Sequence, residues 1–103
     1  MSDIQEQLKK EITKEKVVIF MKGTPQAPQC GFSYSTCEIF NQLKVPYHTV
    51  DVLADQQVRE GIKQLTNWPT IPQVFVNGKF IGGCDITREL FESGELVKLL
   101  EQK

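Results

Sequence analysis

The stretch QVFVNGKFI, residues 73–81, is the part of the sequence that decides the fold. Two short runs of β-branched and aromatic residues flank Asn77-Gly78. This dipeptide is the strongest short-range signal for a type I′ turn, because both residues tolerate the positive φ angles that the turn requires. The pattern therefore predicts a β-hairpin, with strands over residues 73–76 and 79–81.

The segments upstream and downstream of the hairpin place it in a mixed α/β sheet. Residues 17–21 form a continuous apolar run, which is typical of a strand buried on both faces, and residues 47–52 predict a second strand. Apolar residues at helical spacing predict helices over residues 4–12, 30–43 and 55–66, and a last helix from Cys84 to Lys103 that breaks near Gly94. The spacing in the second of these helices places Phe32 on a buried stripe with Phe40. The order predicts one domain over residues 1–103, an α/β fold with a four-stranded mixed sheet flanked by helices and an extra N-terminal helix.

Composition limits the classes of partner. The 103 residues carry a formal net charge of -1, which gives no broad attraction to nucleic acid or to anionic membranes. No stretch approaches the roughly 20 apolar residues of a membrane span. Three cysteines at irregular spacings do not form a secreted disulfide framework, and the polar N-terminus lacks the apolar core of a signal peptide. We therefore expect a cytoplasmic protein without nucleic-acid or membrane partners.

Cys30 is the first candidate for chemistry. It lies where a loop meets the start of a predicted helix, and unpaired N–H groups at a helix start favour the thiolate. Lys22, at the end of the preceding strand, is a second source of positive potential. Cys30 is therefore a candidate reactive nucleophile or metal ligand, and the alternative is a solvent-exposed cysteine without a chemical role. In the sequence Cys30-Gly31-Phe32-Ser33, a hydroxyl stands where a dithiol redox pair has its second cysteine.

The other two cysteines have different interpretations. Cys37 lies two helical turns after Cys30, about 10.5 Å along the axis, whereas a disulfide needs Cα atoms within about 7 Å. We interpret Cys37 as a buried apolar residue. Cys84 lies in a Gly-Gly-Cys-Asp turn at a helix start, which suits carboxylate binding by backbone N–H groups. A structural or ligand-contact role is favoured there over that of a resolving thiol. Trp68 is interpreted as a core residue, and His48 is not nominated.

Three motifs in order carry a family resemblance. Residues 22–25 with 30–33, residues 68–73 (WPTIPQ) and residues 82–85 (GGCD) resemble the signatures of the monothiol glutaredoxins of the CGFS type, which have the thioredoxin fold. The resemblance implies glutathione binding and a [2Fe-2S] cluster shared by two protomers. Cys30 of each protomer and the thiol of each of two glutathiones would then be the metal ligands.

The resemblance also implies which residues contact glutathione. Carried over by position, these are Lys22, Arg59, the backbone of Ile71 before a cis-proline at Pro72, Cys84 and Asp85, with assistance from Lys63. Each has an alternative: Arg59 and Lys63 as solvated helix charges, Asp85 as an N-cap only, and Pro72 as a trans edge-strand proline.

The absent second thiol separates the functions that the family allows. Cys30 alone can form a mixed disulfide with glutathione, but it cannot release a protein disulfide by internal exchange. The favoured hypothesis is a homodimer bridged by the cluster, which passes the cluster to apo-proteins in iron–sulfur assembly. The alternative is a glutathione-dependent thiol oxidoreductase that works by a monothiol route. A third reading is a regulatory adaptor that pairs with a BolA-type protein through the cluster.

Overall fold

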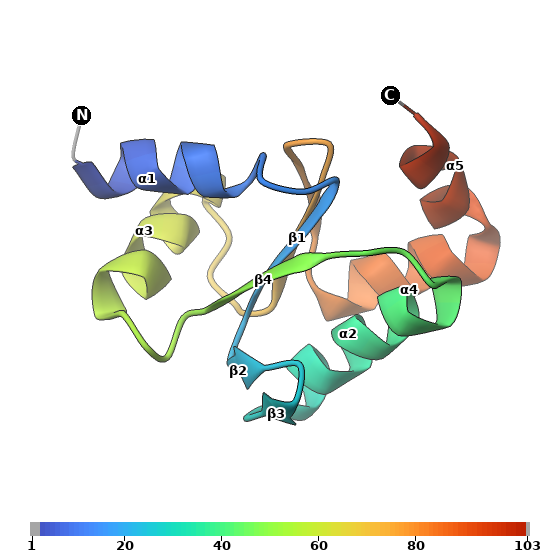
Figure 1. Cartoon of the computed structure of the whole chain (residues 1–103), viewed down its shortest axis with the longest axis horizontal. Coiled ribbons are helices and arrows are strands. Elements are labelled where there is room, and N and C mark those ends of the chain that lie inside the picture. The colour runs from blue at the N-terminus through green and yellow to red at the C-terminus, as the bar shows by residue number, and fades with distance from the viewer. Residues whose placement is uncertain (1–2, 103) are drawn as a thin grey trace.

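A four-stranded mixed sheet forms the centre of the molecule (Figure 1). The computed structural model describes residues 3–102. The sheet contains β1 (Val17–Met21), β4 (His48–Asp51), β5 (Gln73–Val76) and β6 (Lys79–Gly82), in the order β4-β1-β5-β6. Strand β1 pairs in parallel with β4 and antiparallel with β5, and β5 pairs antiparallel with β6. The predicted α/β class and mixed sheet are confirmed.

The hairpin has the predicted turn. Asn77 and Gly78 have φ angles of 54° and 78°, both positive as a type I′ turn requires. Strand β6 extends one residue further than predicted, to Gly82. The chain then turns into the last pair of helices.

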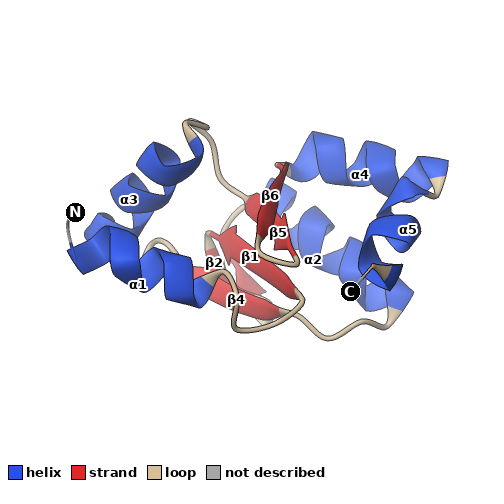
Figure 2. Ribbon diagram, turned by 90° about the horizontal axis from the view of Figure 1, so that it is seen from above, coloured by secondary structure: helices blue, strands red, loops and turns tan. Residues whose placement is uncertain are grey.

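Helices cover both faces of the sheet (Figure 2). The helices are α1 (Asp3–Glu11), α2 (Gly31–Leu43), α3 (Gln56–Thr66), α4 (Cys84–Ser93) and α5 (Glu95–Glu101). Helices α1 and α3 pack together against one face, and α2, α4 and α5 cover the other. Every residue of β1 is fully buried because alternate side chains enter the two separate cores. This explains the continuous apolar run that the sequence shows.

Two details differ from the sequence-based expectation, and a third agrees with it. Residues 23–28, expected as a loop, contain a small antiparallel pair, β2 (Gly23–Thr24) and β3 (Ala27–Pro28). Phe32, expected on the buried stripe of its helix, is 62% exposed, because the buried face of α2 runs through Ser33, Cys37 and Phe40 and Phe32 lines the pocket instead. The last helix breaks at Gly94 (φ 84°) as expected and continues to Glu101, whereas Lys103 lies outside the described residues. Among residues 3–102, no helix combines the length and apolarity that crossing a bilayer requires.

Candidate functional site

Cys30 is the N-cap residue of α2, with extended backbone angles of −154° and 134°. Its sulfur lies where the first N–H groups of the helix are free of intrahelical partners. A hydrogen bond from the Ser33 backbone is the main cause that lowers the pKa of the Cys30 thiol. Partial burial opposes this effect, while the Phe32 backbone, the Lys22 charge and the Ser33 side chain add to it. The site therefore favours a partly exposed thiolate, which is the reactive and metal-binding form.

Ser33 is part of the structure that holds this thiolate. Its side chain is fully buried, and its hydroxyl accepts a hydrogen bond of 3.1 Å from the backbone N–H of Lys22. The bond joins the end of β1 to the first turn of α2. The Lys22 carbonyl in turn accepts a hydrogen bond of 2.9 Å from the N–H of Gln29. This bond joins the two ends of the segment that contains β2 and β3, directly before Cys30.

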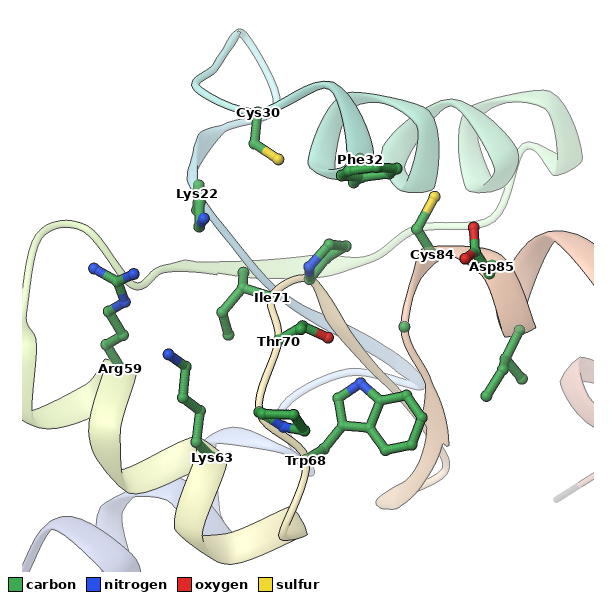
Figure 3. Close-up of a pocket in the computed structure, with 14 residues that line it drawn as sticks. Lys22, Cys30, Phe32, Arg59, Lys63, Trp68, Thr70, Ile71, Cys84 and Asp85 are labelled. Atoms are coloured by element: carbon green, nitrogen blue, oxygen red, sulfur yellow. The ribbon is translucent and has the colours of Figure 1, made fainter.

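A pocket of about 560 Å³ opens beside Cys30 (Figure 3). This volume lies within the range of small-molecule sites. Its walls come from the end of β1, the start of α2, the exposed end of α3, the loop of residues 67–72 and the start of α4. The residues that line it are Lys22, Cys30, Phe32, Arg59, Lys63, Trp68, Pro69, Thr70, Ile71, Pro72, Gly83, Cys84, Asp85 and Ile86.

Charge is separated across this pocket. Figure 3 shows Arg59 and Lys63 projecting from α3 on one side, with Lys22 next to them, and Asp85 on the other side at the start of α4. Arg59 Nε is buried and has no hydrogen-bond partner among the described residues. Arg59 and Lys63 therefore face a cavity instead of bulk solvent alone. A ligand with a carboxylate at one end and an ammonium at the other matches this distribution.

The loop between α3 and β5 forms the floor of the pocket. The peptide bond between Ile71 and Pro72 is cis, so the alternative of a trans proline is wrong. Trp68 lines the pocket and packs edge-to-face on Phe80 with ring centroids 5.7 Å apart. The prediction that Trp68 is a core residue therefore needs correction, because the side chain is only partly buried and forms part of the pocket wall.

The start of α4 forms the wall opposite α3. Gly83 is the N-cap residue of this helix, so Asp85 lies within its first turn and the N-cap alternative for Asp85 is wrong. A Cβ atom on Gly83 would lie 3.2 Å from the Pro72 carbonyl oxygen, so the close approach of the two segments favours glycine. Cys84 is 6% exposed, and its Sγ accepts a hydrogen bond of 3.5 Å from Arg88 Nη2.

Cys37 and His48 lie away from the pocket. Cys37 is 3% exposed and its Sγ lies 3.5 Å from Met21 Sδ, as the interpretation of a buried apolar residue predicted. Burial raises the pKa of the Cys37 thiol. His48 Nε2 lies 2.6 Å from Glu11 Oε1. Within residues 3–102, no group of three or more histidine, cysteine or acidic residues is arranged to bind a metal ion.

The structure brings every sequence-nominated residue into one pocket. Cys30 and the five residues that the resemblance assigned to glutathione all line it, although they come from distant parts of the chain. Sequence reasoning missed the pocket positions of Phe32 and Thr70. Both stand inside the quoted motifs, next to nominated residues, and this proximity was the available signal.

Comparisons with known proteins identify relatives of this chain. A family model described as Glutaredoxin matches residues 17–81. The "Uncharacterized monothiol glutaredoxin ycf64-like" of Synechocystis is 57% identical over 90 residues, which cover 87% of this chain and 84% of that protein. The "Glutaredoxin-related protein 5, mitochondrial" of Danio rerio is 52% identical over 99 residues, 95% of this chain but only 64% of that protein.

One of the solved structures with the same fold is a complex with a ligand. The crystal structure of the buckwheat glutaredoxin–glutathione complex superposes with a TM-score of 0.84 at 28% sequence identity. The match covers 94% of this chain and 86% of the buckwheat chain.

Proposed function

Since the chain belongs to the glutaredoxin family, and within it to the monothiol members, we propose that it binds glutathione in the Cys30 pocket and carries a [2Fe-2S] cluster to apo-proteins. The observation that supports this most is the position of Cys30. A thiol with a lowered pKa stands at the edge of a pocket whose two sides carry opposite charge. A second thiol does not follow it at Ser33.

Glutathione suits this pocket chemically. It has two carboxylates and one ammonium, and Lys22 with Arg59 would bind one carboxylate through charge-assisted hydrogen bonds. The N–H groups at the start of α4 would take the other carboxylate, and Asp85 would accept from the ammonium. The backbone of Ile71 would pair with the tripeptide as an added strand does. The glutathione thiol would then lie near Cys30.

The cluster requires more ligands than one chain supplies. A [2Fe-2S] centre is usually held by four thiolates, and the described residues contain no preformed group of metal ligands. Two chains that each contribute Cys30, with two glutathiones, would supply four. Ser33 supports this proposal, because a hydroxyl at this position cannot form a disulfide with Cys30 as the second cysteine of a dithiol pair would. A BolA-type protein is proposed as a further partner, binding the loaded form more tightly than the apo form.

Anaerobic reconstitution with iron, sulfide and glutathione tests the proposal. We expect broad visible absorption on a dimer in size-exclusion chromatography, and its loss without glutathione or in Cys30→Ser. The matched control is Cys37→Ala, which removes a thiol outside the pocket and should retain the colour. A colourless monomer under every condition would contradict the carrier function.

The second candidate is a glutathione-dependent thiol oxidoreductase, which the partial exposure of Cys30 favours. The Cys30 thiolate would attack the glutathione sulfur of a glutathionylated protein, and the protein thiolate would leave. A second glutathione thiolate would then attack the Cys30 mixed disulfide, forming glutathione disulfide and restoring the Cys30 thiolate. This activity predicts turnover that Cys30→Ser abolishes and that does not depend on iron.

A further inference from the structure

Gln73 is a fully buried polar side chain whose partners lie in the floor of the pocket. It is the first residue of β5 and directly follows Pro72. Its Oε1 accepts a hydrogen bond of 2.9 Å from the Thr66 hydroxyl at the end of α3. Its Nε2 donates to two carbonyl oxygens of the preceding loop, residues 67–72: those of Trp68 at 3.0 Å and Thr70 at 3.2 Å.

One carboxamide therefore joins α3, β5 and the loop between them. An amide has one acceptor oxygen and two N–H donors, and in Gln73 all of these have partners. This satisfies a polar group that would otherwise be costly to bury. Since both donors serve the same loop, the contact fixes the path of the loop at two points.

The loop that Gln73 holds is part of the ligand site. Trp68, Thr70 and Ile71 line the pocket, whereas Gln73 itself does not. The backbone N–H of Trp68 donates a hydrogen bond of 3.2 Å to the Lys63 carbonyl near the end of α3. The buried Gln73 side chain thus binds the middle of the loop on the side that faces away from the pocket.

We propose that Gln73 is a positioning residue for ligand binding: it holds the loop of residues 67–72 in the conformation that presents Ile71 to glutathione. The proposal rests on the proposed glutathione function, but its structural part concerns the loop alone. Without the two donor bonds, the loop would populate several conformations. If the competent one fell to a tenth of the population, the apparent affinity would fall by about tenfold.

Two substitutions separate the hydrogen bonds from the shape of the side chain. Gln73→Met keeps a long unbranched side chain and removes the polar atoms. Gln73→Glu replaces the donor nitrogen with an oxygen that repels both loop carbonyls when it is ionised. When the introduced carboxyl is protonated, it donates one hydrogen bond again. The ratio of the glutathione affinity of Gln73→Glu to that of the wild type should therefore be higher at acidic pH than at alkaline pH. For Gln73→Met this ratio should not change with pH.

Leu96→Ala is the control for a general loss of stability. Leu96 is fully buried in the core on the other side of the sheet, among residues that do not line the pocket. The Leu96→Ala substitution should lower the thermal stability and leave the glutathione affinity unchanged. Reduced glutathione is the probe, measured by calorimetry at pH 5 and pH 8.

Trp68 reports on the loop without any ligand, because it is the single tryptophan of the chain. We expect Gln73→Met and Gln73→Glu at pH 8 to shift its emission and to increase its quenching by acrylamide, and Leu96→Ala to change neither. Folded Gln73 variants with wild-type emission, quenching and affinity would overturn the proposal. If Gln73→Met does not fold, the comparison of Gln73→Glu with wild type at the two pH values decides. A wild type that fails to bind glutathione refutes the proposed function, while the Trp68 measurements still test the loop.

Discussion

Glu11 Oε1 lies 2.6 Å from His48 Nε2, so a hydrogen bond joins the end of α1 to the edge strand β4. Burial by itself raises the pKa of Glu11. The hydrogen bonds from His48 and Lys14 and the positive charge of Lys14 have the larger, opposite effect, so the pKa is lowered overall. A carboxylate with a lowered pKa stabilises the folded state above its unfolded pKa, near 4.3, and this stabilisation is lost as the pH falls through the folded pKa.

Glu11→Gln should therefore destabilise the protein at pH 7 by about 0.5–1 kcal/mol, since the pair is only partly buried. The difference from wild type should shrink as the pH is lowered and vanish once the native carboxylate is protonated. Urea unfolding over a series of pH values from 7 downward measures this. Glu6→Gln, an exposed change on the same helix, is the control. A cost that does not change with pH would refute the stabilising role of the Glu11 carboxylate.

Ser33→Ala should destabilise the fold by about 1–3 kcal/mol, because the buried N–H of Lys22 loses its acceptor. It should also raise the pKa of Cys30, although the backbone bond from Ser33, the main lowering cause, remains. The pH dependence of alkylation by iodoacetamide measures that pKa. Ser35→Ala on the same helix is the control. An unchanged stability would show that the hydrogen bond contributes nothing.

Lys22→Gln and Arg59→Gln should have different effects. Lys22 contributes to the low pKa of Cys30, so its substitution should raise that pKa and slow alkylation at neutral pH. Arg59 is not among the causes of that shift, so Arg59→Gln should leave the alkylation profile unchanged. Both variants should weaken glutathione binding, by about tenfold each if a charge-assisted bond is lost. Equal alkylation profiles for Lys22→Gln and wild type would contradict the electrostatic role.

Cys37 should remain unreactive until the protein unfolds. Burial raises the pKa of its thiol and shields the sulfur, whereas Cys30 is partly exposed with a lowered pKa. A thiol reagent such as Ellman's reagent should modify Cys30 first in the native protein and Cys37 only after denaturant is added. Mass spectrometry of the modified peptides identifies the site. Rapid labelling of Cys37 in the native state would contradict its burial.

The sequence patterns predicted the helices, strands and turns well, because these elements depend mainly on residues that are neighbours in the sequence. Asn77-Gly78 requires positive φ angles at both residues, and the structure has them. The apolar run of β1 reflects burial on both faces, which the two cores confirm. Phe32 was placed wrongly because helical spacing allowed two neighbouring faces of the helix, and the buried face is the one that contains Ser33.

The sequence alone determined the strand order along the chain, the hairpin turn, the position of Cys30 at a helix start and, through its three motifs, the family. Only the tertiary structure decided that Arg59, Ile71 and Cys84 share one pocket with Cys30, and that Ser33 and Gln73 are buried behind it. The reason is physical. Turn angles and helix starts depend on neighbouring residues, whereas a pocket and its supporting hydrogen bonds depend on how distant segments pack across the sheet.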